Sequence, residues 1–172
     1  VDTVVPRKPR ENIDNGDYHV YARGNDRRAV FEDDIDRRNY LRLLGSTVQS
    51  LGWRCFAYCL MPNHLHLLVR TPNADLSEGM QKLQGSYVLG FNARHGSVGH
   101  LFQGRYGAKL VRSDRQLQLT AAYIARNPTA AGLCEHAEDW AWGSYQSVVR
   151  GAEPPWLHVA DLLGWFAAGG GD

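Results

Sequence analysis

Residues 53–70 constrain the fold of this chain more than any other stretch. Residues 53–61, WRCFAYCLM, are rich in aromatic and β-forming side chains, and residues 64–70, HLHLLVR, form a second strand-like run. Pro62 and Asn63 lie between the two runs and favour a tight turn, because proline presets the backbone for a turn and asparagine tolerates its unusual conformations. The stretch therefore predicts a β-hairpin.

The segments around the hairpin predict an antiparallel sheet. Residues 17–23, DYHVYAR, alternate in polarity and predict a strand, and residues 101–112 are expected to be extended. Helical spacing of apolar residues predicts helices over about residues 34–51 and 75–94. The order strand–helix–strand–strand–helix–strand predicts an α+β fold, a ferredoxin-like antiparallel sheet flanked by helices.

Two more helices are expected after the predicted sheet. Ser113 can cap a third helix, and Pro128 is expected to end it, because the residue before a proline is pushed out of the helical conformation. A short helix at about residues 156–168 would be appended at the C-terminal end. With 172 residues the chain is expected to form one domain, with an extended lead-in at residues 1–16 and the C-terminal helix and tail at residues 151–172.

Composition limits the kinds of partner and compartment. The net charge is +1, so no overall basic field would attract nucleic acid, and an anionic ligand must be held by a local patch. The three cysteines show no CxxC spacing, which favours reduced thiols in the cytoplasm. The chain contains no run of about 18 apolar residues, so no membrane span is expected.

A histidine pair stands where apolar residues would pack better. Because side chains alternate along a strand, His64 and His66 project from one face, opposite to the face of Leu65, Leu67 and Val69. Two imidazoles at this spacing can hold one divalent cation. The spacing alone leaves open the alternative that they are half-exposed sheet residues with a structural hydrogen bond.

A tyrosine and an asparagine share one side of the predicted third helix. Tyr123 and Asn127 are four residues apart and therefore neighbours on a helix, whereas Leu117, Ala121 and Ile124 fall on the side expected to be buried. A phenol can act as a nucleophile when a metal or a cationic group helps it to react, and phosphoryl transfer suits that chemistry. Asn127 could supply an amide oxygen as a third metal ligand. The alternative is a tyrosine that packs against the core.

Taken together, these segments resemble the REP-associated tyrosine transposases, a branch of the single-tyrosine transposases with a His-hydrophobic-His (HUH) motif. The resemblance spans about residues 17–150, and each motif is weak alone, while their order and spacing are specific. Two departures are Thr129-Ala130 in place of Val-Arg, and Gly143 in place of the first serine of Trp-Ser-Ser-Tyr. The motifs are YHVYARGND (18–26), MPNHLHLLV (61–69), GHLFQGRY (99–106), YIARNPTAAGL (123–133) and DWAWGSY (139–145).

The resemblance implies a metal-dependent DNA enzyme. Tyr123 would be the nucleophile that forms a 5′-phosphotyrosine link to single-stranded DNA, and His64, His66 and Asn127 would hold Mg²⁺ or Mn²⁺. The substrate would be single-stranded DNA beside hairpins formed by short palindromic repeats. The protein is expected to be a monomer, with a dimer as the alternative, and to act in the bacterial cytoplasm at the nucleoid.

Basic and aromatic side chains outside this set are candidates for DNA contacts. Phosphates require cationic or polar partners, and unpaired bases require aromatic surfaces on which to stack. The predicted DNA-binding residues are Arg23, Asn25, Arg27, Arg28, Arg105, Tyr106, Lys109, Arg112, Trp142 and Tyr145, with Trp140 as a further stacking candidate.

Two other functions remain open on the sequence. A ferredoxin-like sheet can bind single-stranded nucleic acid without any catalysis. A metal site could also serve the hydrolysis of a small phosphate ester, although the chain shows no second carboxylate cluster and no glycine-rich phosphate loop that would favour it.

Overall fold

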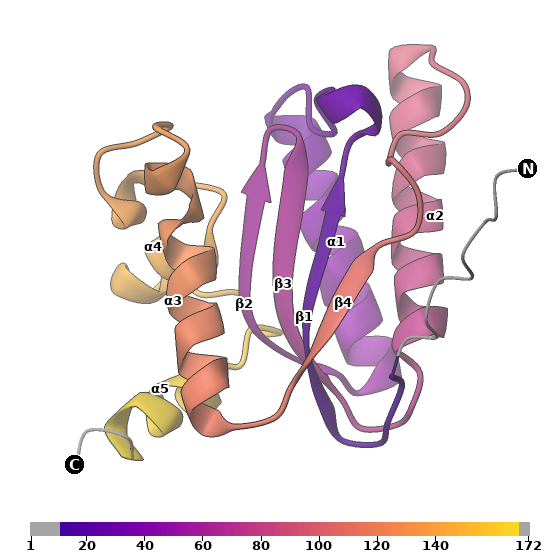
Figure 1. Cartoon of the computed structure of the whole chain (residues 1–172). Helices are drawn as coiled ribbons and strands as arrows, with labels where there is room; N and C mark the ends of the chain where they lie inside the picture. Colours follow the sequence, from indigo (N-terminus) through magenta and orange to yellow (C-terminus); the bar gives the residue numbers. More distant parts are fainter. Residues whose placement is uncertain (1–10, 169–172) are drawn as a thin grey trace, which may run out of the picture.

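The computed structural model describes residues 11–168, and Figure 1 shows a sheet with helices on both sides. The sheet has four strands in the order β2-β3-β1-β4, and every neighbouring pair is antiparallel. This order is that of a ferredoxin-like sheet, so the predicted α+β fold is confirmed. The strands are β1 (Gly16–Arg23), β2 (Arg54–Met61), β3 (His64–Thr71) and β4 (Gly107–Val111).

Helices α1 (Asp34–Leu51) and α2 (Leu76–His95) cover one face of the sheet. The side chain of Asp33 caps α1 by accepting hydrogen bonds from the backbone N–H groups of Ile35 and Asp36. Gly52 ends α1 in the left-handed conformation, at φ 65°. The larger hydrophobic core lies between these helices and the sheet and includes Tyr18, Val20, Tyr40, Leu44, Leu65, Leu67, Met80 and Tyr87.

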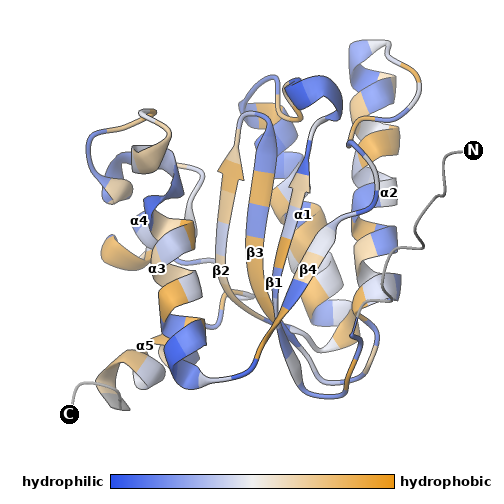
Figure 2. Ribbon diagram, in the orientation of Figure 1, coloured by the Kyte–Doolittle hydropathy of each residue, from blue (hydrophilic) through white to orange (hydrophobic). Residues whose placement is uncertain are grey.

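Helices α3 (Asp114–Ala130) and α5 (Val159–Ala168) pack on the opposite face. The short elements η2 (Ala137–Asp139) and α4 (Ser144–Val149) connect them. Figure 2 shows that β2 and β3 are hydrophobic along much of their length, as expected for strands buried on both faces. A second core on this side includes Phe56, Met61, Leu68, Val111, Leu117, Ala121 and Ile124.

The predicted end of α3 at Pro128 is wrong, because the helix continues to Ala130 with the proline buried inside it. A proline this near the end removes one hydrogen bond of the helix without stopping it. Bonds on either side hold the last turn, since the N–H of Ala131 donates to the carbonyl of Asn127 (3.1 Å) and the N–H of Leu133 to that of Pro128 (3.0 Å). Asn127 therefore stays helical and one turn away from Tyr123.

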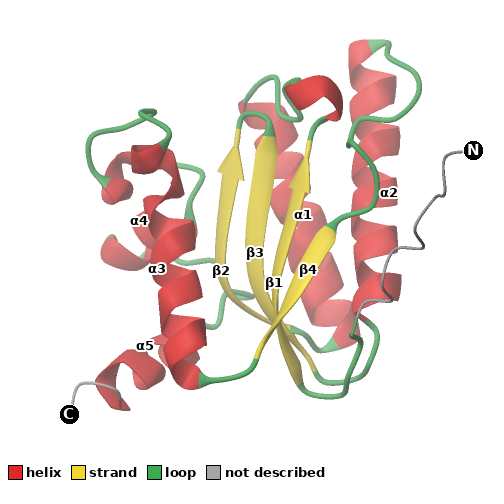
Figure 3. Ribbon diagram, in the orientation of Figure 1, coloured by secondary structure: helices red, strands yellow, loops and turns green. Residues whose placement is uncertain are grey.

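Other differences from the sequence expectations lie at element ends. The region predicted to be extended from residue 101 is a loop up to residue 106 (Figure 3), because Gly104 at φ 143° and the buried ring of Tyr106 turn the chain before β4. Helix α4 was not predicted, and α5 begins at Val159 rather than at residue 156. Within residues 11–168, no helix is both long and apolar enough to span a membrane. The expected lead-in and tail lie largely outside the described residues.

Candidate active site

The pairing of β1 with β3 gathers polar side chains on the face that α3 covers. His66 lies opposite Tyr21, and His64 lies opposite Arg23. His19 is two residues from Tyr21 on the same strand, so it is a diagonal neighbour of His66. The alternate residues of both strands fill the larger core, which fixes the direction of these side chains.

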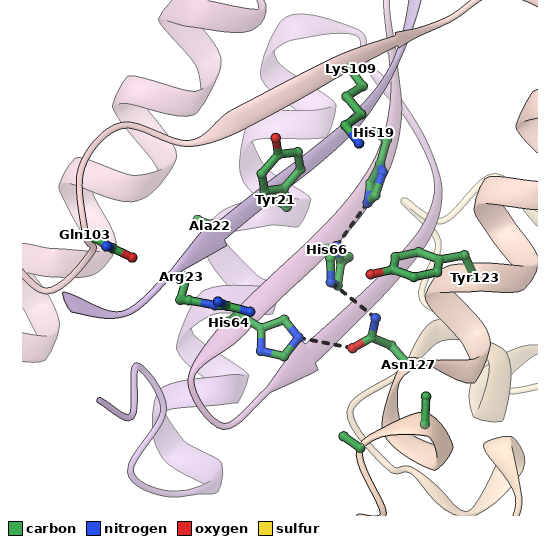
Figure 4. Close-up of a pocket in the computed structure, with 12 residues that line it drawn as sticks. His19, Tyr21, Ala22, Arg23, His64, His66, Gln103, Lys109, Tyr123 and Asn127 are labelled. Atoms are coloured by element: carbon green, nitrogen blue, oxygen red, sulfur yellow. Dashed lines mark hydrogen bonds between the residues drawn. The ribbon is translucent and has the colours of Figure 1, made fainter. Parts of the chain in front are cut away.

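Helix α3 brings Tyr123 and Asn127 over the same face, as Figure 4 shows. The ring centroid of Tyr123 lies 5.4 Å from that of His66 and 5.8 Å from that of His19. Tyr123 is 50% exposed, so an incoming ligand can reach it. Ser113 anchors the start of α3, since its side chain accepts a hydrogen bond from the N–H of Gln116.

The hydrogen bonds around His64 leave two acceptors facing each other. Asn63 is oriented by its Nδ2, which donates to the carbonyl of Arg27 (3.1 Å), so its Oδ1 faces Nδ1 of His64 (2.7 Å). An amide oxygen only accepts, and a neutral ring has one N–H, so the shorter contact to Asn63 favours the proton on Nδ1 and leaves Nε2 of His64 as an acceptor. Oδ1 of Asn127, a second acceptor, lies 3.0 Å from that Nε2. A shared cation would make this arrangement favourable.

The donor set fits a divalent metal. His66 turns its Nε2 toward the same side chain, 3.4 Å from Nδ2 of Asn127. Neighbouring ligand atoms of an octahedral cation with bonds of about 2.1 Å lie about 3.0 Å apart. The distance of 3.0 Å between Nε2 of His64 and Oδ1 of Asn127 matches this separation. Among residues 11–168, no three His, Cys, Asp or Glu side chains form a metal-binding group. A metal here would therefore depend on the amide oxygen and on water or phosphate oxygens.

Burial keeps the histidines of this site uncharged. Burial is the main cause that lowers the pKa of His66 to about 3, and the neighbouring His19, His64 and Arg23 contribute to the same shift. Burial also lowers the pKa of His19 to about 4, with a smaller effect of Lys109. Burial lowers the pKa of His64 as well, whereas the amide oxygen of Asn127, which can accept a hydrogen bond from the protonated ring, raises it. Neutral rings offer the nitrogen lone pairs that a metal requires.

These side chains line an open cavity of about 690 Å³. Arg23 and Lys109 contribute positive charge to its wall, and Gln103 contributes an amide. The ring of Tyr21 occupies the space that a side chain at Gly107 would fill, because a Cβ atom there would lie 2.3 Å from the ring. A cavity with cations and an aromatic ring in its wall suits an anionic chain that also carries bases.

The model of the IS200-like transposase family matches residues 12–127. This chain belongs to that family. A Haemophilus influenzae protein named among the REP-associated tyrosine transposases is 26% identical over an alignment of 115 residues, and the match covers 60% of this chain and 65% of that protein. The chain thus spans slightly less than two thirds of the length of this relative.

A solved structure of a REP-associated tyrosine transposase bound to a REP hairpin has the same fold. Its TM-score is 0.73 at 18% sequence identity, covering 87% of this chain and 89% of that chain. At this level of identity the likeness shows the fold. With the family match, it confirms the resemblance expected from the motifs.

Some of the residues predicted to contact DNA lie at or near this cavity. Arg23 and Lys109 line it. Asn25, Arg27 and Arg28 lie in and directly after the short helix η1 (Asn25–Arg27), which Asn63 links to His64. Arg27 has a φ of 59° and follows another residue with positive φ, a costly backbone conformation that is typical of functional loops.

The remaining candidates lie elsewhere. Arg105 is exposed beside a separate groove along α2, and Arg112 is exposed and forms an ion pair with Glu11. The stacking prediction for Tyr106 is wrong, because the ring is 6% exposed and packs in the larger core, with its hydroxyl bonded to Oγ of Ser77 (3.2 Å).

The candidate stacking residues after α3 also lie outside the cavity. Trp142 is partly buried, and the guanidinium of Arg37 lies 5.6 Å from the centre of its ring. Trp140 is partly buried as well and donates from Nε1 to the carbonyl of Leu60 (3.2 Å). Tyr145, on α4, is 42% exposed.

The sequence predictions missed His19, Tyr21 and Asn63 as parts of the site. The alternation in residues 17–23 carried the signal for two of them, because His19 and Tyr21 share a face with Arg23. The distance from His19 to His66 depends on the register between β1 and β3, which joins residues far apart in the chain.

Proposed function

We propose that this transposase cuts and rejoins single-stranded DNA beside hairpins of palindromic repeats, through a covalent bond between Tyr123 and a 5′ phosphate. The main support is the position of Tyr123, exposed at the cavity, beside His66 and one helical turn from Asn127. The relatives with REP-associated names, one of them bound to a REP hairpin, support a hairpin substrate.

In the proposed first step, Oη of Tyr123 attacks the phosphorus of a phosphodiester. A bond forms between phosphorus and Oη while the bond from phosphorus to the 3′ oxygen breaks. The phenol proton passes to solvent at the exposed hydroxyl, and the leaving 3′ oxygen takes up a proton. Rejoining reverses these changes when a 3′ hydroxyl attacks the phosphotyrosine, so the bond is conserved and no nucleotide cofactor is required.

His64, His66 and Asn127 would hold the Mg²⁺ or Mn²⁺ that neutralises charge on the reacting phosphate. Arg23 of β1 and Lys109 of β4 both line the cavity. They would bind phosphates of the DNA on either side of the cut. Arg23 pairs with His64 of β3, and Lys109 pairs with His19 of β1, so the sheet places both cations beside the proposed metal site.

The test is a search for a covalent protein–DNA adduct. A DNA hairpin with a single-stranded flank is incubated with the protein and Mn²⁺, and the products are separated in SDS. We expect an SDS-resistant adduct with the unaltered protein and none with Tyr123→Phe. An adduct that persists in Tyr123→Phe would show that the nucleophile is another residue.

Tyr40→Phe is the matched control. Its hydroxyl is buried in the larger core and has no hydrogen-bond partner among the described residues, so its removal should leave both folding and the adduct intact. Tight hairpin binding that EDTA does not affect, with no adduct, would instead indicate the non-catalytic binding module.

A further inference from the structure

Each histidine of the proposed metal site has a partner on the ring nitrogen that faces away from Asn127. Nδ1 of His66 lies 3.0 Å from Nε2 of His19, and Nδ1 of His64 lies 2.7 Å from Oδ1 of Asn63. Figure 4 shows His19 and Asn127 on opposite sides of the His66 ring. Each of the two ligand rings thus contacts a polar partner through its Nδ1, and the two partners come from different parts of the fold.

The partners define the tautomer of His66 as they do that of His64. Nδ2 of Asn127, a donor, faces Nε2 of His66 at 3.4 Å, so this nitrogen accepts. A neutral imidazole carries a single ring proton, which therefore lies on Nδ1 of His66 and is donated to Nε2 of His19. His19 in turn carries its own proton on Nδ1.

We propose that His19 and Asn63 are positioning residues that keep His66 and His64 in the Nδ1-protonated tautomer, with both Nε2 lone pairs turned toward Asn127. This inference deepens the proposed function. Any effect of His19 and Asn63 on DNA cleavage rests on that proposed function. Loss of such a partner typically weakens metal binding 10–100-fold, because the ligand ring then loses its fixed orientation and tautomer.

The positions of both residues suit this role. His19 lies in the middle of β1, between Leu68 of β3 and Lys109 of β4, so its backbone is held on both sides. The carbonyl of Asn63 accepts the N–H of Gly24 (2.8 Å), and its side chain donates to Arg27 (3.1 Å). Asn63 thereby joins the orientation of His64 to the turn that carries Arg27.

The first test reads the tautomers directly. Long-range proton–nitrogen NMR spectra of metal-free, DNA-free protein with ¹⁵N-labelled histidines distinguish Nδ1–H from Nε2–H rings. We expect the Nδ1–H pattern for both His64 and His66. An Nε2–H pattern for His66 in the unaltered protein would overturn the role of His19, and the same pattern for His64 would overturn that of Asn63.

The second test compares variants by the affinity for Mn²⁺ alone, measured by electron paramagnetic resonance. His19→Phe keeps the ring volume without an acceptor and should weaken Mn²⁺ binding 10–100-fold. His19→Gln restores an acceptor and should recover most of the affinity. Asn63→Asp keeps the acceptor for His64, whereas Asn63→Leu removes it, so only the latter should weaken binding strongly.

His100→Gln, at an exposed histidine outside the cavity, is the control for non-specific Mn²⁺ binding. Unchanged Mn²⁺ affinity in a folded His19→Phe protein would overturn the proposal. The NMR test needs neither a variant nor cleavage, so it remains decisive if His19→Phe does not fold. Failure of the adduct assay with the predicted tautomers observed would refute the proposed function and leave the tautomer assignment standing.

Discussion

Mild acid should destabilise the metal-free protein through the buried histidines of the site. His66 is 7% exposed, and its pKa is lowered from 6.5 to about 3 in the folded protein, chiefly by burial. Between pH 6.5 and pH 3 the unfolded chain binds more protons than the folded protein. The free energy of unfolding is therefore highest above pH 6.5, as far as His66 contributes to it, and decreases as the pH falls.

The size of the effect follows from the two pKa values. In the unfolded chain, a histidine with pKa 6.5 is protonated between pH 7.5 and pH 5, which stabilises that state by about 2 kcal/mol. In the folded protein, His66 takes up almost no proton over the same range. His19, whose pKa is lowered to about 4, should add a similar amount, about 2 kcal/mol. This is a large fraction of the stability of a typical domain.

The assay is urea unfolding at pH 7.5 and pH 5.0 in EDTA, with the unaltered protein and His66→Leu. Leucine suits the site because Leu68 occupies the same face of β3. We expect the variant to lose about 2 kcal/mol less between the two pH values than the unaltered protein does. His100→Gln, at an exposed histidine, should behave like the unaltered protein. Equal losses in His66→Leu and the unaltered protein would refute this reasoning.

Three further predictions concern packing, capping and DNA binding. Gly79→Ala should cost about 1–3 kcal/mol in urea unfolding, because its Cβ would lie 2.2 Å from the ring of Trp53. Gly85→Ala, on the same helix, is the control: no atom of residues 11–168 lies within 4 Å of its Cβ, so this change should be neutral or stabilising. Ser113→Ala should cost about 1 kcal/mol in the same assay through loss of the α3 cap, and full stability would contradict the capping role. Lys109→Met should weaken hairpin binding and lower the slope of log affinity against log salt by about 1, and an unchanged slope would exclude a phosphate contact.

Local periodicity was enough to predict most of the fold and half of the site. The alternation in residues 64–70 assigned His64 and His66 to one face, and helical spacing assigned Tyr123 and Asn127 to one side of α3. These features depend on near neighbours in the chain, which explains why the sequence predicts them well.

The features that were missed depend on contacts between distant segments. The bond between His19 and His66 requires the register of β1 against β3, and the burial of Tyr106 requires the packing of the 101–106 loop on α2. Pro128 was expected to end α3, yet bonds to the carbonyls of the last turn keep the helix continuous. These local bonds, together with the burial of Pro128, thus outweigh the tendency of proline to end a helix and keep Asn127 helical.

The most direct test of the proposed tyrosine nucleophile is mass spectrometry of the protein after reaction with a hairpin substrate and Mn²⁺. Protease and nuclease digestion should leave one peptide with a nucleotide attached through its 5′ phosphate. We predict that fragmentation places the added mass on Tyr123. A nucleotide found on any other residue, or a cut substrate with no modified peptide, would contradict the proposed mechanism.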